Sequence, residues 1–248
     1  MAITYQKALI TANEQMTDTV FLLKAQWSAP TQPGQFFMLR TWDKAPLLSR
    51  PISVHNWENG IVEFLYEVRG TGTDLLSQAK AGDFIELTGA LGKGFPVENI
   101  SGKVAVVSGG IGIAPLYYVV RALVQKGCTV DFYCGFRDKP YGLEKFEALC
   151  SNVYLATDSG NYGVKGFVTD LLQPEGYDAV LTCGPEIMME KIAHKAMAAG
   201  TAVYVSKESH MACGIGACLA CTCKTKGGPK SVCKDGPVFK GEDIYADC

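Results

Sequence analysis

The sequence lacks the features that mark several large classes of protein. Its 248 residues carry a formal net charge of −2 and contain no long basic run, which argues against a nucleic acid partner. No apolar run is long enough to span a membrane, and residues 1–12 lack the charged and then apolar pattern of a signal peptide. Neither internal repeats nor low-complexity segments are present. We therefore expect a globular protein of the cytoplasm that binds neither nucleic acid nor membrane.

Histidine is also scarce, which limits the candidates for acid–base catalysis. The three histidines, His55, His194 and His210, are isolated from one another and are predicted to lie on the surface or in loops. No histidine or carboxylate is expected to be catalytic. Apolar residues make up 48% and charged residues 19% of the chain, which is enough to build ordinary hydrophobic cores.

Cysteine, in contrast, is abundant and unevenly placed. Of ten cysteines, five fall within residues 213–233 and one is the final residue. The other four are scattered: Cys128, Cys134, Cys150 and Cys183. Disulfide scaffolds are small secreted chains with little core, whereas this chain is large and hydrophobic. A local cysteine cluster in a reducing compartment favours a metal site.

The spacing within the cluster indicates which metal. Three cysteines follow a C-x4-C-x2-C pattern and a fourth lies further on, as in plant-type [2Fe–2S] proteins. The preferred ligands are Cys213, Cys218, Cys221 and Cys233. Gly214 and Gly216 would let the backbone approach an inorganic core. Cys223 remains a competing ligand, and a structural zinc site remains an alternative, although zinc usually takes two short cysteine knuckles.

The first hundred residues contain short strands separated by turn signals, which predicts a small antiparallel β-barrel or sandwich, of which the barrel is preferred. The expected strands are Thr4–Ile10, Thr19–Ala25, Gln35–Arg40, Ile52–Asn56, Ile61–Val68 and Asp83–Leu87. One short helix, Asp74–Lys80, is expected to interrupt them.

From Gly102 onward strands and helices alternate, which predicts a doubly wound parallel α/β domain. The expected strands are Val104–Ser108, Thr129–Cys134, Val153–Thr157, Ala179–Cys183 and Ala202–Val205, and the expected helices are Ala114–Gln125, Leu143–Leu149, Phe167–Leu172 and Glu186–Ala198. After Lys207 the periodicity ends, and the remaining residues are too few for an independent core without a metal. We expect three domains: residues 1–98, 99–207 and 208–248.

Two motifs in the barrel region fit a flavin nucleotide. Arg50, Pro51, Ile52 and Ser53 begin a strand, where an arginine can pair with a pyrophosphate and a serine can hydrogen bond a flavin ring nitrogen. Downstream, Gly72-Thr73 opens the expected helix, whose N–H groups favour phosphate. Each motif alone is weak, but together they are moderately specific.

A glycine-rich turn follows the first strand of the α/β region. Gly109, Gly110 and Gly112 precede Pro115, so a pyrophosphate could approach a helix N-terminus there, although the spacing is not G-x-G-x-x-G. A second strand ends in the run Cys183, Gly184, Pro185, which places a thiol and a tight turn at the carboxyl edge of the same sheet.

Taken in order, these motifs resemble those of the ferredoxin–NADP reductase superfamily. With the cysteine cluster added, the whole chain resembles one branch, the electron-transfer subunits of class 1B dihydroorotate dehydrogenases. The resemblance implies that FAD is held by Arg50–Ser53, by Leu65, Tyr66 and Glu67, and by Gly72 and Thr73. It implies that NAD docks over the glycine turn and the Cys183–Pro185 turn. Cys221 and Cys233 are closer in sequence than this branch leads us to expect.

The resemblance also implies a partner and a pathway. The partner would be an FMN-containing catalytic subunit that oxidises dihydroorotate, in a heterotetramer with two of each subunit, for pyrimidine synthesis. Electrons would pass from FMN through the cluster and FAD to NAD⁺. Arg137 could pair with a 2′-phosphate, so the sequence leaves NADP open. Two alternatives remain: a subunit of a sulfide dehydrogenase or NAD(P)H–ferredoxin reductase, and a scaffold subunit with structural zinc.

Overall fold

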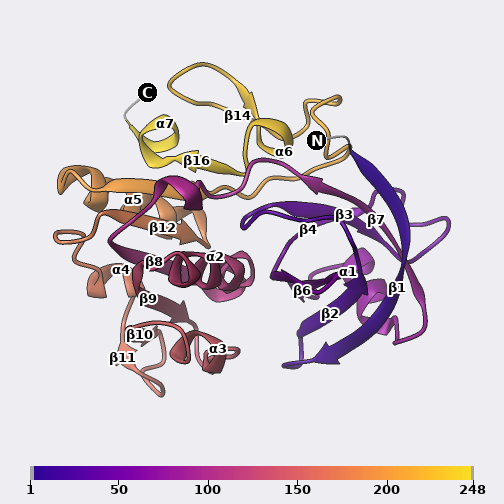
Figure 1. Cartoon of the computed structure of the whole chain (residues 1–248), viewed down its shortest axis with the longest axis horizontal. Coiled ribbons are helices and arrows are strands. Elements are labelled where there is room, and N and C mark those ends of the chain that lie inside the picture. Colours follow the sequence, from indigo (N-terminus) through magenta and orange to yellow (C-terminus); the bar gives the residue numbers. More distant parts are fainter. Residues whose placement is uncertain (1–2, 247–248) are drawn as a thin grey trace.

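A computed structural model describes residues 3–246 of the chain. It contains two large sheets that lie side by side, with the C-terminal residues running across the top of both (Figure 1). No helix in residues 3–246 has both the length and the apolar character that crossing a membrane requires.

The N-terminal sheet is antiparallel and curls into an incompletely closed barrel, as the sequence predicted. Its strands are β1 (Thr4–Gln15), β2 (Val20–Gln26), β3 (Phe36–Arg40), β4 (Arg50–Ser53), β5 (Asn56–Glu58), β6 (Ile61–Glu67) and β7 (Phe84–Leu91). They pair in the order β4-β3-β7-β1-β2-β6-β5. The two edge strands, β4 and β5, are separated in sequence only by Val54 and His55, so the sheet must bend back on itself. Its interior is filled by large apolar side chains such as Trp27, Phe37 and Phe64.

A short helix, α1 (Thr71–Gln78), lies between β6 and β7. It begins three residues before the expected start at Asp74 and ends two residues before Lys80. The sequence Thr-Gly-Thr has weak helix propensity, but the Thr73 hydroxyl accepts the N–H groups of Arg69 and Gly70 at 2.9 and 3.2 Å. This local bonding fixes the helix start.

The second sheet is the predicted doubly wound α/β sheet. Its strands are β8 (Lys103–Gly109), β9 (Thr129–Phe136), β10 (Asn152–Thr157), β11 (Val164–Lys165), β12 (Ala179–Cys183), β13 (Ala202–Ser206) and β16 (Val238–Lys240). The order is β11-β10-β9-β8-β12-β13-β16, and every pair is parallel except β13–β16. The strands that follow β8 in the chain are added first on one side of it, as β9 to β11, and then on the other side, as β12 and β13. The strand order therefore reverses between β8 and β12.

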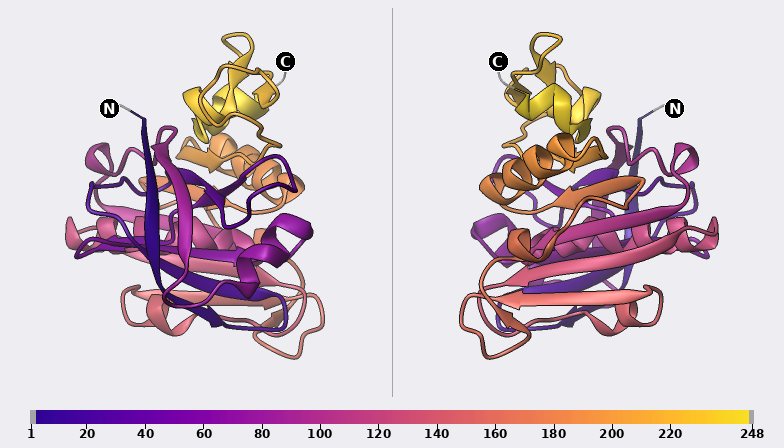
Figure 2. Two further views of the ribbon diagram at one scale, coloured as in Figure 1. Left: turned by 90° about the vertical axis from the view of Figure 1, so that its right-hand side faces the viewer. Right: turned by 90° about the vertical axis from the view of Figure 1, so that its left-hand side faces the viewer.

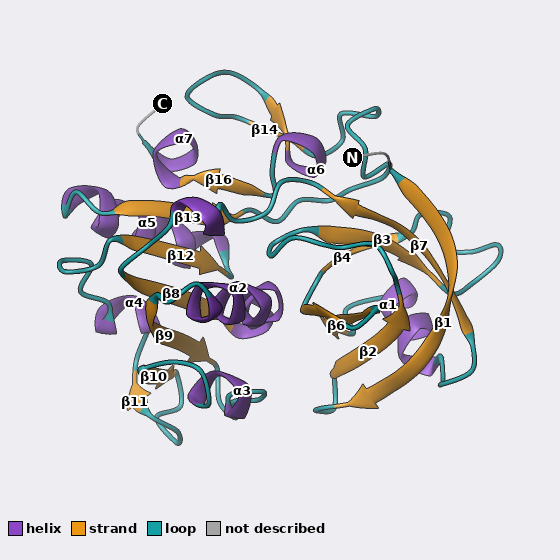
Figure 3. Ribbon diagram, viewed as in Figure 1, coloured by secondary structure: helices purple, strands orange, loops and turns teal. Residues whose placement is uncertain are grey.

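Helices cover both faces of this sheet (Figure 3). One core contains α2 (Ile113–Gln125) and α3 (Glu144–Glu147), and the other contains α4 (Val168–Leu171) and α5 (Glu186–Ala198). Two 3₁₀ turns, Val97–Asn99 and Gly110–Gly112, precede β8 and α2.

Helix α2 also joins the two sheets, because Val20, Leu22 and Leu65 of the barrel belong to its core. His55 lies at this junction, only 4% exposed, and its Nδ1 donates to the Ala114 carbonyl at 2.7 Å. His55 therefore lies in a loop, between β4 and β5, as one part of the prediction allowed, but it is buried and not on the surface. One isolated polar residue in a strand region gives no pattern from which this burial can be read.

The C-terminal residues form a small cap instead of a separate body (Figure 2). The cap contains β14 (Thr222–Cys223), β15 (Lys230–Ser231), α6 (Val232–Asp235), β16 and α7 (Gly241–Tyr245). Strand β16, which the sequence did not predict, pairs antiparallel with β13 and extends the α/β sheet. Val232 and Phe239 of the cap share a core with Phe36 and Met38 of the barrel.

Candidate functional site

A cleft of about 280 Å³ lies between the barrel and the carboxyl ends of the parallel strands. Its lining includes most of the residues that the sequence nominated: Arg50, Pro51, Ile52, Ser53, Leu65, Tyr66, Glu67, Thr73, Pro115 and Cys183. The two flavin motifs and the two nucleotide motifs therefore meet at one place.

On the barrel side, the Arg50 side chain packs directly against the backbone of Gly72. A Cβ atom on Gly72 would lie 2.3 Å from Arg50 Nε, so only glycine leaves room for the guanidinium. The guanidinium also lies over the Trp42 ring at 5.6 Å. The arginine is thus held against the first turn of α1, where a cation and free N–H groups together suit a pyrophosphate.

On the α/β side, glycines allow the turn after β8 to pack closely against the end of β12 and the helix that follows it. This is the point where the sheet order reverses. A Cβ on Gly112 would lie 2.2 Å from the Cys183 carbonyl oxygen, and one on Gly109 would lie 2.7 Å from Met188 Sδ. Gly110 has a φ of +53°, and a Cβ there would meet no atom within 4 Å. The backbone of this turn is therefore open toward a ligand, at the edge where open α/β sheets bind nucleotides.

Cys183 is buried at the base of this crevice. Burial raises the pKa of its thiol to about 12, so the group is a neutral thiol near pH 7. Cys183 is therefore suited to packing against a bound ring and unsuited to acting as a nucleophile, because the thiolate is the reactive form.

Not every nominated residue lines the cleft. Six nominated residues are not among those that line it: Gly72, Gly109, Gly110, Gly112, Gly184 and Pro185. Others line it without having been nominated, among them Ile111, Ala114, Ser206, Lys207, Glu208 and Ser209. Ser206 ends β13, and residues 207–209 directly follow it. The rule that ligands bind at the carboxyl edge of a parallel sheet would have found them.

Above the cleft, backbone N–H groups of the cysteine loop point at sulfur atoms. The N–H groups of Ile215 and Cys218 donate to Cys213 Sγ at 3.4 Å each, and Gly216 N donates to Cys233 Sγ at 3.1 Å. Cys233 N donates to Cys221 Sγ at 3.4 Å. Such donors stabilise thiolates and the sulfur ligands of an iron–sulfur cluster.

The four preferred cysteines form two pairs. Within each pair the backbone N–H of one residue donates to the sulfur of the other, from Cys218 to Cys213 and from Cys233 to Cys221. Burial raises the pKa of Cys213, but the N–H donors and the Cys218 thiol outweigh it and lower the value to about 6. Two thiol pairs match the need of a two-iron cluster, in which each iron takes two thiolates.

The competing ligand is placed differently from the preferred cysteines. Cys223 lies in β14 opposite Lys230. Within residues 3–246, no three His, Cys, Asp or Glu side chains converge closely enough to hold a single ion.

The cleft and the cysteine loop share a wall. Phe36 and Met211 line the cleft and also pack in the hydrophobic core that contains Cys221 and Cys233. The hydrophobic core behind the cleft is therefore continuous with the core that holds two cysteines of the loop.

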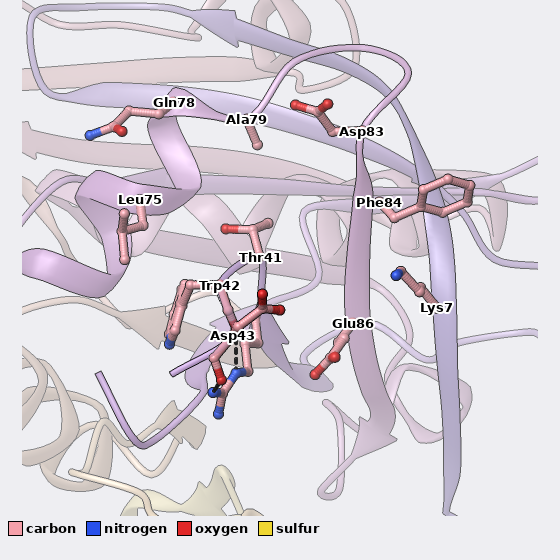
Figure 4. Close-up of a pocket in the computed structure, with 11 residues that line it drawn as sticks. Lys7, Thr41, Trp42, Asp43, Leu75, Gln78, Ala79, Asp83, Phe84 and Glu86 are labelled. Carbon is pink, nitrogen blue, oxygen red and sulfur yellow. Dashed lines mark hydrogen bonds between the residues drawn. The ribbon is translucent and has the colours of Figure 1, made fainter. Parts of the chain in front are cut away.

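Another cavity, of about 490 Å³, lies on the outer side of the barrel (Figure 4). Trp42 and Asp43 lie across it from Phe84 and Glu86. Arg40, which also lines it, donates to the carbonyls of Trp42 and Leu47 at 2.6 and 2.9 Å and to that of Asp43. This arginine is occupied by its own loop, and the other cation of the cavity, Lys7, lies over the Phe84 ring at 5.5 Å.

Comparison with known proteins gives the family. A model of the iron–sulfur cluster binding domain of dihydroorotate dehydrogenase B matches residues 208–245. The electron transfer subunit of dihydroorotate dehydrogenase B (NAD⁺) from Clostridium acetobutylicum is 49% identical, with 94% of each chain covered. The chain belongs to the family of dihydroorotate dehydrogenase B electron transfer subunits. The corresponding subunit from Clostridium perfringens is 43% identical over 98% of this chain and 99% of its own.

Solved structures agree with the fold of this family. A structure of the NADH-dependent reduced ferredoxin–NADP oxidoreductase, described for flavin-based electron bifurcation, is 32% identical with a TM-score of 0.87, covering 96% of this chain and 90% of that one. A ferredoxin–NADP⁺ reductase from Neisseria gonorrhoeae with bound FAD and NADP has a TM-score of 0.67 over 79% of this chain and 92% of its own, at 18% identity. The latter likeness shows the fold alone. The predicted membership, the fold class and the role as an oxidoreductase subunit are confirmed.

Proposed function

We propose that this chain carries electrons from the FMN of a dihydroorotate-oxidising catalytic subunit to NAD⁺, in pyrimidine synthesis, within a complex of two copies of each subunit. Family membership supports the catalytic partner and the use of NAD⁺. FAD and a [2Fe–2S] cluster supply the redox chemistry, in which the flavin exchanges electron pairs with the nicotinamide and single electrons with the cluster.

The residues of the cleft are suited to holding both nucleotides. Arg50 and the first turn of α1 would hold the FAD pyrophosphate, Ser53 would hydrogen bond its ring system, and residues 65–67 would line the ring. The glycine turn and Cys183–Pro185 would receive NAD⁺ from the opposite wall. The protein binds and orients here; no side chain is required to move a proton.

The shared wall formed by Phe36 and Met211 carries the proposal. The hydrophobic core to which both side chains belong also contains Cys221 and Cys233, two of the four proposed cluster ligands, which supports a short path between flavin and cluster. On its other side the loop is open, because Cys218 is exposed and Leu219 and Ile215 are 64% and 43% exposed. Exposed apolar side chains next to a redox site suit contact with a protein partner. The catalytic subunit would therefore bind over this loop and segment 207–211.

The free thiols support the proposal that the protein is located in a reducing compartment, the cytoplasm. All nine cysteines among the described residues are free, including buried Cys128 and Cys134.

Anaerobic purification followed by absorption spectroscopy and iron, sulfide and flavin assays tests the cofactor content. We expect about two irons, two sulfides and one FAD per chain. A colourless protein that contains zinc and no flavin would refute the proposal and would favour the scaffold alternative.

One observation favours a second candidate. The bifurcating oxidoreductase of known structure is similar over nearly the whole chain, so a subunit of an NAD(P)H–ferredoxin reductase would share this architecture. The two functions differ in the electron donor. Reduction of the flavin by a dihydroorotate-oxidising subunit supports the first, whereas reduction only by ferredoxin supports the second.

A further inference from the structure

A buried histidine links the two walls of the cleft. His55 lies two residues after Ser53, which lines the barrel wall, and its Nδ1 donates to the Ala114 carbonyl at 2.7 Å. Ala114 belongs to the first turn of α2 and lines the opposite wall. Nδ1 must carry the hydrogen because a carbonyl oxygen can only accept, and burial lowers the pKa of His55 to about 3, so the ring is neutral near pH 7. One hydrogen bond therefore connects residues beside the proposed flavin site to residues beside the proposed nicotinamide site.

The histidine is itself held from both sides. The backbone N–H of Val54 donates to the Gln35 carbonyl at 2.9 Å, and the N–H of His55 donates to the Glu63 carbonyl at 2.8 Å, so the connection back to β4 is fixed. On the other side, the imidazole stacks on the Tyr117 ring of α2, with ring centroids 5.1 Å apart and planes inclined by 25°. The barrel backbone and the helix together determine where the imidazole points.

This hydrogen bond lies beside the cleft, and the attachment of α2 to the barrel does not depend on it alone. Apolar barrel side chains already belong to the α2 core, and the Tyr118 hydroxyl donates to the Thr31 carbonyl at 2.9 Å. Neither Tyr118 nor Thr31 lines the cleft. In an α-helix each carbonyl also receives the N–H four residues further on, so Ala114 keeps a partner when the imidazole is removed. Loss of the His55 bond should therefore disturb the cleft more than it unfolds the protein.

The spacing of the two walls matters for the chemistry that the two nucleotides would perform. FAD and NAD are proposed to bind to different walls, one on each sheet, and a hydride passes only between ring atoms about 3–3.5 Å apart. A misplacement of about 1 Å can slow such a step about 100-fold. Any change in the angle between the sheets alters that separation. A hydrogen bond beside the point where the rings would meet limits this change more directly than one further along α2.

We infer that His55 is a positioning residue for hydride transfer, which sets the separation of the flavin and nicotinamide rings by tying the end of β4 to the first turn of α2. This inference rests on the proposed function, in which both nucleotides occupy the cleft. His55 does not line the cleft and has no part in moving a proton or a hydride. It acts through Ser53 and Ala114, whose relative positions it holds.

The test uses three single variants of the FAD-loaded protein. His55→Phe keeps an aromatic ring that can stack on Tyr117 but removes the donor, whereas His55→Asn keeps an N–H donor near the position of Nδ1. The matched control, Tyr118→Phe, removes a buried hydrogen bond of similar length between α2 and the barrel, one helical turn further from the cleft.

Anaerobic stopped-flow mixing with NADH measures the transfer of one hydride, with its two electrons, from the nicotinamide to FAD. This is the reverse of the proposed direction, but it uses the same contact between the rings. Varying the NADH concentration separates the rate at saturation from the Kd for NADH. The long-wavelength charge-transfer absorbance of the complex reports the stacking of the two rings independently of the rate, and urea unfolding of the apoprotein reports stability.

We expect His55→Phe to lower the saturating rate about 10- to 100-fold and to weaken the charge-transfer band, with the Kd for NADH changed less than about threefold. His55→Asn should keep the rate within about threefold of the wild type, because the donor is retained. Tyr118→Phe should keep it within about twofold, although it removes a hydrogen bond and lowers stability.

A wild-type rate and band in His55→Phe would overturn the assignment, as would an equal loss of rate in Tyr118→Phe. If His55→Phe does not load FAD, His55→Leu, which has no ring to overpack the site, carries the same expectation. Failure of both variants to fold would show that His55 serves the stability of the junction, and this would also overturn the assignment. A wild-type protein whose FAD is not reduced by NADH would instead contradict the proposed function.

Discussion

Replacement of Gly72 by alanine should weaken the binding of flavin without lowering the stability of the barrel. The new Cβ would lie 2.3 Å from Arg50 Nε and 2.7 Å from Arg50 Cζ, so the guanidinium must move. The atoms that move are the end of a flexible side chain, which makes the displacement cheap for folding. Alanine is moreover a better helix former than glycine, by up to about 1 kcal/mol.

The loss should therefore appear in flavin binding. A hydrogen bond to a charged group contributes about 1.5–3 kcal/mol, and every 1.4 kcal/mol is a factor of ten in affinity. We expect Gly72→Ala to bind FAD about 10- to 150-fold more weakly, with an unfolding free energy of the apoprotein that is unchanged or slightly higher. Titration of the apoprotein with FAD, followed by flavin fluorescence, gives the first quantity, and urea unfolding gives the second.

Gly70 provides the control, because its φ of −179° is extended and a Cβ there would meet no atom within 4 Å. Gly70→Ala should change FAD affinity by less than about threefold, since only a weak helix cap is altered. If Gly72→Ala binds FAD as tightly as the wild type, Arg50 does not hold the pyrophosphate and the flavin side of the cleft is misassigned.

Three further predictions follow from other parts of the molecule. Cys221→Ser should abolish the cluster absorbance and leave FAD bound, whereas Cys223→Ser should retain the cluster; the opposite pattern would make Cys223 the ligand. Because burial lowers the pKa of His55 to about 3, the unfolded state binds a proton that the folded state excludes, and stability is lost as pH falls from 6.5 toward 3. Urea unfolding should show a slope of about 1.4 kcal/mol per pH unit from this group, which His55→Gln removes; an unchanged slope would mean that the histidine titrates freely when folded. Asp131, with a side chain 1% exposed, accepts hydrogen bonds from Asn152 and Tyr177. Asp131→Ala should cost about 2–4 kcal/mol in unfolding free energy, and a cost below about 0.5 kcal/mol would show that this network is dispensable.

Most of the architecture could be predicted because local patterns and the final fold agree. The strands expected at Val104–Ser108 and Ala179–Cys183 are mostly apolar runs followed by glycine, and they occur as Lys103–Gly109 and Ala179–Cys183. Strand β16 was missed because three residues carry no periodicity, and only its pairing with β13 makes Val238–Lys240 a strand.

The candidate site could be predicted where a short motif determines the backbone conformation of its own residues. The nominated residues of the barrel and of the α/β sheet meet in one cleft, as their motifs require. The contribution of Ser206–Ser209 depends on where a strand end lies in three dimensions, and the burial of His55 depends on the docking of α2. The first follows from the predicted strand and the carboxyl-edge rule, whereas the second is not encoded in a short run of sequence. The assignments of individual ligands remain predictions.

Reconstitution with an FMN-containing catalytic subunit tests the central claim most directly. Dihydroorotate-dependent formation of NADH should require both subunits, and the complex with Cys221→Ser should lose it while dihydroorotate still reduces the FMN. NADH formation by the catalytic subunit alone, or full activity in the complex with the cysteine variant, would contradict the account.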